Sequence, residues 1–236
     1  MRVVKFFLVA LLLVGLYVSS SQSIPSSRES SIALSGAHAA PLHDGNDLTK
    51  TASAQRYLLD SSRSKFIARA FSGGLLWFKG HDHLVAVRDF TGEAQITPDS
   101  IMPASLQITA KAASLVETRD VFTEPQKQII NRELREIVLL PEQYPDISFR
   151  STNITGRAIG NSVYDLKIVG ALTLHGVTRQ ISIPTKVTLS GNELRAQGEF
   201  SINRSDFKVK ATSALHGMIR VRDKVKFEFD IVGNLR

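Results

Sequence analysis

Residues 163–185 read VYDLKIVGALTLHGVTRQISIPT and carry the clearest structural pattern in the chain. Apolar residues alternate with polar or small ones from Leu166 to Leu174, which is the period of a strand with one face against a core. Gly176 then permits a tight turn, and Ile181 and Ile183 resume the alternation. The stretch therefore predicts two antiparallel strands joined by a hairpin, with one apolar face and one face in water.

Similar alternation recurs along the chain after residue 57. Short alternating runs are separated by Gly, Pro, Asn or Asp, and the turn-like sequence SGNE at residues 190–193 joins two of them. The runs are residues 66–71, 85–96, 105–112, 147–154, 164–174, 180–189, 194–202 and 225–232. Many short strands with turn residues between them predict an antiparallel barrel or sandwich.

Residues 124–140 break this period of two. Apolar residues recur there at helical spacing, and Pro141 then stops the run. These apolar residues are Ile130, Leu134, Ile137 and Val138. We expect a single helix with one apolar side, lying against an open end or the outer wall of the barrel.

Four segments occur in an order that is typical of a known family. They are YLLD at residues 57–60, YPDISFRS at 144–151, VGALTLHGVT at 169–178 and NRSDF at 203–207. Together they resemble the YceI-like family of lipocalin-like barrels, which bind polyisoprenoids and other long-chain lipids, and the resemblance covers residues 57–236. It implies an all-β fold with one helix, an antiparallel barrel of about eight strands. It also implies that the ligand is an isoprenoid quinone or its precursor, or a fatty acid or amide.

Strand parity places a set of large apolar side chains on one inward face of such a barrel. They are Ile108, Phe149, Leu172, Leu174, Phe200, Ile202, Phe227 and Phe229. Gly170, Ala196 and Gly198 share this face, and their small size favours a tunnel that holds one slender lipid. The alternative is that these small residues let the strands bend around a filled core.

Four residues are candidates for contacts with the ligand at the mouth of the barrel. They are Trp77, His81, His83 and Arg204. Imidazoles and a guanidinium are suitable hydrogen-bond partners for a lipid head group. For Arg204, the alternative is a structural role, pinned by a carboxylate such as Asp206 and by backbone carbonyls where the chain turns. For Trp77, the alternative is a place in the core.

The sequence His81-Asp82-His83 also supports a metal hypothesis, because imidazoles two residues apart on an extended chain point the same way. Further ligands are required, and nothing in the sequence brings together the candidates, which are His175, His216, and Asp82 or Asp89. Another interpretation is a polar turn whose groups bond to backbone and water. We favour the turn, with no metal and no cofactor.

Residues 1–23 resemble a secretory signal peptide, because two basic residues precede an apolar run at 6–18 and small polar residues follow. Residues 24–55 are rich in Ser, Ala and Gly and predict a flexible tether, and residues 56–236 predict the barrel domain. We therefore expect a periplasmic or secreted protein. The alternative is that the apolar run remains as an uncleaved membrane anchor.

The chain is basic, with a net charge of +7, and it contains no cysteine. Stability must therefore come from burial without disulfides. Basic residues concentrate in residues 204–226, which is typical of contact with a membrane surface, although a solvated strand face gives the same pattern. Nucleic acid is not an expected partner, because no aromatic residues are interleaved with these cations. Pairing of two barrels along an edge strand, as a homodimer, stays open.

The sequence contains none of the common catalytic motifs, such as Gly-x-Ser-x-Gly, a phosphate-binding glycine loop or His-Glu-x-x-His. We therefore predict a protein that is not an enzyme and that sequesters or carries a long-chain apolar molecule in its lumen. One alternative is a metal-binding protein or metal-dependent enzyme organised on His81 and His83. Another is a structural or interaction barrel with a filled core.

Overall fold

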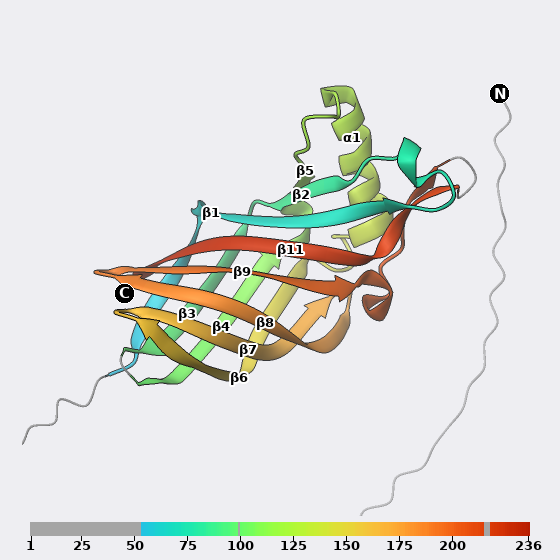
Figure 1. The fold of residues 1–236 in the computed structure, drawn as a ribbon. Helices are drawn as coiled ribbons and strands as arrows, with labels where there is room; N and C mark the ends of the chain where they lie inside the picture. The colour runs from blue at the N-terminus through green and yellow to red at the C-terminus, as the bar shows by residue number, and fades with distance from the viewer. Residues whose placement is uncertain (1–52, 99, 215–217) are drawn as a thin grey trace, which may run out of the picture. The chain divides into compact units, whose positions relative to one another are not determined.

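The computed structural model describes residues 53–98, 100–214 and 218–236, which belong to one compact unit (Figure 1). The predicted signal peptide and almost all of the predicted tether lie outside these residues. Within the described part, eight antiparallel strands close a barrel through the pairing of β1 with β11. In chain order these are β1 (Gln55–Gly73), β3 (Phe90–Thr97), β4 (Ile101–Lys111), β6 (Asp146–Gly160), β7 (Val163–Leu174), β8 (Val177–Ser190), β9 (Glu193–Asn203) and β11 (Ile219–Leu235). The predicted all-β barrel is confirmed.

The hairpin predicted from residues 163–185 is the β7–β8 pair. Its register runs from Val163 opposite Thr188 to Leu174 opposite Val177, so the turn is the two-residue sequence His175-Gly176. Both turn residues have positive φ angles, 52° and 73°, as a tight hairpin requires. The inward residues of β7 are buried from Tyr164 to Leu172, and Lys167 is exposed, which confirms the predicted alternation.

Three short strands lie outside the eight-strand circuit. They are β2 (His83–Val87), β5 (Leu115–Glu117) and β10 (Ser213–Ala214). The sequence pattern treats residues 85–96 as one strand, but the structure divides it at Arg88 and Asp89 into β2 and β3. The division arises because β1 is longer than its neighbours, so β3 pairs with its first residues and β2 with its last part. In the described part, β5 and β10 are the outermost strands of the sheet, and both are short.

The predicted helix is present but changes its character along its length. The α-helix α1 (Glu124–Glu133) begins at a capping box formed by Thr123 and Gln126, and it continues as the π-helix η3 (Leu134–Leu139). Leu140 ends it in the left-handed conformation, one residue before Pro141. Three short 3₁₀ helices complete the described elements: η1 (Trp77–Lys79), η2 (Ala112–Ser114) and η4 (Arg204–Phe207). In the described residues, no helix is both long and apolar enough to cross a membrane.

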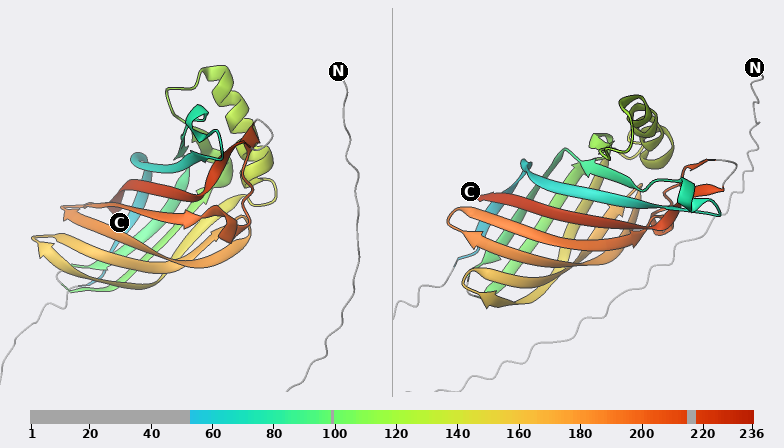
Figure 2. Two further views of the ribbon diagram at one scale, coloured as in Figure 1. Left: turned by 45° about the vertical axis from the view of Figure 1, so that its right-hand side comes forward. Right: turned by 45° about the horizontal axis from the view of Figure 1, so that its top comes forward.

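The two ends of the barrel differ. At one end, where β1 and β7 begin, Tyr57 and Tyr164 are almost completely buried and share a core cluster with Leu194. The Tyr57 hydroxyl donates to the side chain of Gln55 at 2.6 Å, and burial, followed by the proximity of Tyr164, raises the pKa of Tyr57. The other end of the barrel carries α1, and β1 and β11 run side by side towards it (Figure 2).

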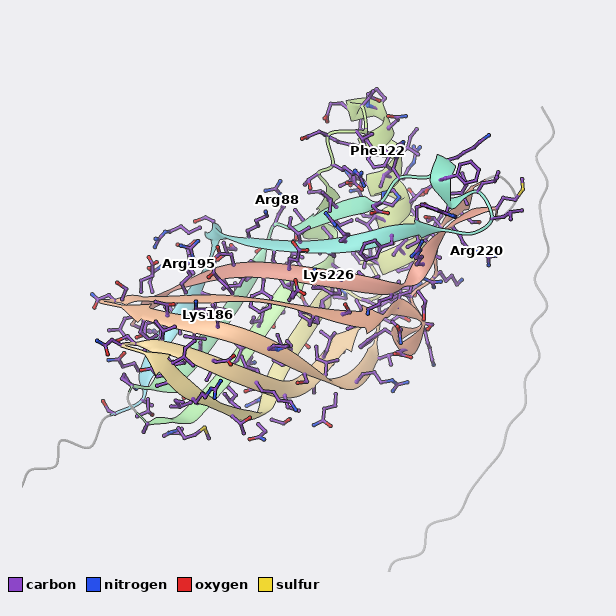
Figure 3. The ribbon with its side chains drawn as sticks, in the orientation of Figure 1. Arg88, Phe122, Lys186, Arg195, Arg220 and Lys226 are labelled. Atoms are coloured by element: carbon purple, nitrogen blue, oxygen red, sulfur yellow. The ribbon has the colours of Figure 1, made fainter. Side chains whose placement is uncertain are left out.

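The outer wall of the barrel is polar. Arg195 on β9 makes a bidentate ion pair with Asp230 on β11 (2.6 and 2.7 Å), and Lys226 pairs with Glu199 at 2.8 Å. Arg195 and Lys226 stand on this wall together with Lys186 (Figure 3). Exposed pairs of this kind contribute little to stability. These charged side chains remain in contact with water on the outer face. Because side chains alternate along a strand, the apolar residues of the same strands face inward.

Candidate functional site

A cavity of about 460 Å³ lies inside the barrel and extends to the end that carries α1. This volume is within the range of about 300–1,000 Å³ that small-molecule pockets occupy. All eight barrel strands contribute side chains to its wall, which is predominantly apolar. The eight residues predicted to face the lumen all line it: Ile108, Phe149, Leu172, Leu174, Phe200, Ile202, Phe227 and Phe229. The interior is therefore hollow and not a filled core.

Aromatic rings form one side of this cavity. The Phe200 and Phe227 rings are stacked, with centroids 4.9 Å apart and planes at 9°. Phe66 on β1 lies 6.1 Å from Phe227 and 6.3 Å from Phe229, and the latter pair is edge-to-face. Phe66 was not among the predicted lumen residues, although its strand was recognised. Aromatic pairs prefer offset-stacked or edge-to-face arrangements, so these rings stabilise one another along the wall.

The wall glycines do not create the cavity, contrary to the expectation from sequence. A Cβ atom at Gly170 would stand 2.5 Å from the Phe149 ring, and one at Gly198 would stand 2.7 Å from the Phe229 ring. Each ring thus occupies the space that a side chain on the neighbouring strand would take. Because these two rings lie over glycines, they rest along the wall, and alanines such as Ala196 leave the space beside them.

The helix closes part of the cavity. Ile130, Leu134, Val138 and Leu139 line it, and Leu139 is buried. Ile137, predicted on the same apolar side, is instead 41% exposed. The π-helical turn accounts for the difference, because its i→i+5 hydrogen bonds make the turn wider than an α-helical one, which brings Leu139 to the cavity and leaves Ile137 outside. Regular α-helical spacing does not place Leu139 on the apolar side of the helix, so the sequence does not predict its contact with the cavity.

The cavity wall becomes charged towards this end. Arg204, Lys210 and Arg220 line it, together with Glu133. The Arg204 guanidinium donates from Nη1 to the Val209 carbonyl at 2.9 Å, and its Nε lies 3.9 Å from the Asp223 carboxylate. The predicted pinning of this arginine is confirmed, but the acid is Asp223 on β11. Asp206, the acid expected from sequence, accepts a bond from Asn203 instead.

His81 and His83 also line the cavity and lie on the same side of the chain, as their spacing predicts. The His83 ring stacks on Phe122 with centroids 5.3 Å apart, and the His81 ring meets Phe122 edge-on at 5.8 Å. Phe122 precedes α1, at the position labelled in Figure 3. One aromatic side chain thus holds both imidazoles at the edge of the cavity.

A buried carboxylate that the sequence did not reveal holds this cluster. Glu117 on β5 accepts from the backbone amides of Leu84, Thr118 and Arg119 through Oε1, and its Oε2 lies 2.8 Å from His83 Nδ1. Burial raises the pKa of Glu117, but the bond with His83 and the backbone bonds outweigh it, and the net shift is downward. A lone Glu in a three-residue strand carries no pattern from which this role can be read.

The described residues contain no cluster of three or more side chains suited to hold a metal ion. Asp82 accepts the Ser72 amide at 3.0 Å, which fits the polar-turn interpretation of His81-Asp82-His83. His175 packs against Tyr144 with ring centroids 4.2 Å apart, and its Nε2 atom is buried without a hydrogen-bond partner in the described part. His216 lies outside the described residues.

Trp77 does not line the cavity, contrary to its prediction as a mouth residue. It lies in η1, beyond the end of β1, and is 55% exposed. Its ring contacts Phe78 edge-to-face at 6.4 Å. The error arises because the chain passes the rim of the barrel at Gly73 and Gly74 before it reaches Trp77, which a strand pattern does not show.

Solved structures with the same fold include proteins of Burkholderia cenocepacia, Saccharophagus degradans and Campylobacter jejuni. The chain is 21% identical to BcnA of Burkholderia cenocepacia, with a TM-score of 0.57 over 74% of this chain and 98% of that one. A polyisoprenoid binding domain from Saccharophagus degradans, implicated in plant cell wall breakdown, is 16% identical, with a TM-score of 0.53 over 76% and 98%. The YceI protein of Campylobacter jejuni is 19% identical, with a TM-score of 0.50 over 64% and 84%.

No curated protein matches the chain significantly. The family model of the YceI-like domain matches residues 57–233, which reach from the start of β1 almost to the end of β11. The match spans most of the chain and coincides with the hollow barrel described above. The chain therefore belongs to the YceI-like family.

Proposed function

We propose that this protein binds one long-chain apolar molecule, an isoprenoid or acyl lipid, in the barrel lumen and carries or sequesters it outside the cytoplasm. The observation that supports this most directly is the 460 Å³ cavity, apolar along its length and charged at one end only. The polyisoprenoid binding domain from Saccharophagus degradans has the same fold, which favours a ligand of this class. The proposed role is binding without a chemical reaction.

The physical basis is the removal of a hydrocarbon chain from water. Each buried methylene contributes about 0.8 kcal/mol, so ten of them contribute roughly 8 kcal/mol before the entropic cost of binding is subtracted. The lining between Ile108 on β4 and Phe229 on β11 offers apolar contacts without a buried charge. Tyr57 and Tyr164 fill the far end, so the ligand enters from the end that carries α1.

The polar end of the ligand then lies at the charged end of the cavity. Arg204, Lys210 and Arg220 outnumber the one acid, Glu133, in the wall there. Guanidinium and ammonium groups bind carboxylate and phosphate oxygens through charge-assisted hydrogen bonds. An acidic head group, such as a carboxylate or phosphate, is therefore preferred to a neutral one of equal chain length.

The experiment is to purify the protein without detergent and to identify the bound lipid by native mass spectrometry and solvent extraction. A blocked variant sharpens it: Ala196→Phe places a ring in the lumen, and Ala158→Phe places the same ring at an exposed position on β6. We expect a prenyl or acyl lipid in the wild type and in Ala158→Phe, and its loss in Ala196→Phe with the fold retained. A lumen that takes up no prenyl or acyl chain in any form contradicts the proposal.

The export part of the proposal has its own test, because residues 1–23 have the layout of a signal peptide. Cell fractionation should place the protein outside the cytoplasm, and its mature N-terminus should begin near residue 24. A protein found in the cytoplasm with Met1 or Arg2 at its N-terminus contradicts export but leaves lipid binding standing.

A further inference from the structure

Large apolar side chains are exposed beyond the end of β1, next to the start of β11. Leu75 is 77% exposed, Trp77 55% and Phe78 63%, and Met218 stands beside them at 41%. We call Leu75, Trp77, Phe78 and Met218 the apolar tip. A concentration of exposed apolar side chains on one surface marks an interaction site, whereas single ones do not.

The apolar tip is held in shape by short-range bonds. The Leu76 amide donates to the Met218 carbonyl at 2.9 Å, and Gly80 closes η1 by donating to the Trp77 carbonyl at 3.0 Å. The Ser72 hydroxyl donates to the same carbonyl at 2.6 Å. Gly74 has a φ of 88° and passes so close to Met218 that a Cβ there would stand 2.5 Å from the Met218 carbonyl oxygen. The exposure of these side chains is therefore built into the local fold.

The chain around the apolar tip is predominantly basic, although the Asp82 carboxylate lies nearby and accepts the Ser72 amide. Residues 61–81 and 207–222 contain no Asp or Glu. They carry Lys79, Lys208, Lys210, Arg220 and Arg222, all exposed. Within the part of the chain that the structure describes, none of these five cations forms an ion pair with an acid, and Figure 3 shows Arg220 at this end. Cations without an acidic partner, placed around exposed apolar side chains, complement a partner whose surface is negatively charged and whose interior is apolar.

The apolar tip adjoins the mouth of the cavity. Ser72, two residues before Gly74, lines the cavity, and so do Ile219 and Arg220, which directly follow Met218. A partner seated on the apolar tip would therefore lie next to the opening of the lumen. An anionic bilayer has both properties that these side chains fit, a negatively charged surface and an apolar interior. It is also the source of the lipid that the lumen is proposed to bind.

We propose that the apolar tip inserts into the surface of an anionic phospholipid bilayer, with Trp77 at the interface and the surrounding cations on the lipid head groups. Trp and Phe partition into the boundary between head groups and acyl chains, and each nearby Lys or Arg adds electrostatic attraction. The docked orientation brings the cavity mouth to the membrane, where lipid is exchanged. This purpose depends on the proposed function, whereas the docking itself does not.

Trp77 is the chain's sole tryptophan, so its fluorescence reports on the apolar tip alone. The intact protein is mixed with vesicles of phosphatidylglycerol and phosphatidylcholine, and with vesicles whose acyl chains are brominated. We expect the emission to move to shorter wavelength with anionic vesicles and to be quenched by the brominated chains. Binding should weaken as salt is raised. Emission that stays unchanged while the vesicles are titrated overturns the proposal.

Two pairs of variants separate the apolar and the basic contributions. Phe78→Ser should weaken vesicle binding roughly tenfold, whereas Ile159→Ser, at a residue that is 51% exposed on β6, should not change it. Lys79→Glu should weaken binding to anionic vesicles on the order of tenfold, whereas Lys186→Glu on the outer wall should have a much smaller effect. All variants have the same N-terminus, so a difference between a variant and its control belongs to the substituted residue. Equal losses in a variant and its control contradict the proposal.

Lipid occupancy, measured by native mass spectrometry on the same samples, separates this inference from the proposed function. Docking without bound lipid supports the bilayer site and contradicts the lumen assignment, and bound lipid without docking does the reverse. Self-association is measured by light scattering in the absence of vesicles. A dimer that Phe78→Ser abolishes, together with no response to vesicles, overturns the proposal, because the apolar tip then binds a second copy of the chain.

Discussion

The imidazole of His83 and the carboxylate of Glu117 lie 2.8 Å apart, between Nδ1 and Oε2, on two strands that are paired only through three residues. Glu117 is buried, and its other oxygen accepts three backbone amides. This one carboxylate therefore ties β2, β5 and the segment before α1 to a histidine that lines the cavity. The structure at the edge of the lumen therefore depends on the buried carboxylate of Glu117.

Replacing Glu117 should destabilise the protein in a pH-dependent manner. Glu117→Ala leaves the three amides without an acceptor, and we expect a loss of about 3 kcal/mol at neutral pH. The pKa of Glu117 is lowered in the folded state, so its contribution is complete above the ordinary glutamate pKa of about 4.3 and is lost as the pH falls through the lower folded value. Urea unfolding from pH 7 to pH 3 should therefore show the wild type and the variant converging in acid.

The matched variant for this comparison is Glu117→Gln, which keeps one oxygen for the amides but removes the charge. It should lose less stability than Glu117→Ala, and its unfolding free energy should change less steeply between pH 5 and pH 3 than that of the wild type. Two variants with the same acid dependence as the wild type would show that this carboxylate is not the group that titrates.

A methyl group at Gly170 should displace an aromatic ring into the lumen. A Cβ at 170 would stand 2.5 Å from the Phe149 ring and closer still to the Arg150 carbonyl oxygen, so both the ring and the neighbouring strand must shift. We expect Gly170→Ala to lose about 1–3 kcal/mol of stability through overpacking. The displaced ring should also reduce lipid binding, measured by titration with a fluorescent acyl chain.

The control is Gly160→Ala, because the nearest atom to a Cβ there is 3.8 Å away and the backbone has no positive φ. It should leave lipid binding unchanged and stability nearly so. If Gly170→Ala binds lipid as the wild type does, the Phe149 ring has another position outside the lumen, and the account of the wall given above is incorrect.

Strand alternation predicted the inside of this barrel, because every second side chain of a strand points to the same face. This rule places Leu172 and Phe227 correctly without knowledge of the strand order. It does not say which strand lies beside which, and the packing of Phe149 over Gly170 depends on the pairing of β6 with β7. The same limitation explains why the glycines were taken as empty space.

The mouth of the cavity was less predictable, because its residues come from segments without a period. Lys210 follows η4 and Glu133 ends α1, and neither belongs to a motif. Arg204 was recognised from its NRSDF segment, but its acid, Asp223, is 19 positions away on another strand. Contacts of this kind are fixed by the tertiary fold, so a sequence without a structure does not reveal them.

Replacing His175 should flatten the pH dependence of stability just below neutral pH. Burial, and then the charge of Lys210, lower the pKa of His175. The unfolded chain therefore binds more protons than the folded protein once the pH falls below about 6.5, and His175 destabilises the fold progressively from there to its lower folded pKa. His175→Asn removes this effect, and Asn tolerates the positive φ of 52° at this turn position.

The measurement is thermal or urea unfolding at pH 7 and pH 5, with an NMR titration of the imidazole as the direct readout. Lys210→Met serves as a partial control, because it removes the neighbouring charge but not the burial, and it should reduce the pH dependence without abolishing it. An imidazole of His175 that titrates at or above the ordinary histidine pKa contradicts the prediction.

Arg204→Gln should weaken the fold and change the choice of ligand at the same time. The substitution removes the bond to the Val209 carbonyl and the ion pair with Asp223, and we expect a loss of about 1–2 kcal/mol. The Nε atom of Arg204 has no hydrogen-bond partner in the described part of the chain, although the side chain lines the cavity. The positive charge of this guanidinium, which lines the cavity, attracts an acidic head group. Binding of a fatty acid should therefore fall more than binding of the alcohol with the same chain, measured by competition with a fluorescent lipid.

Lys186→Gln, which removes a positive charge from the outer wall, should leave both affinities unchanged. Equal losses for the acid and the alcohol would mean that Arg204 only supports the turn after β9, and the acidic head group would then have to be recognised by Lys210 and Arg220.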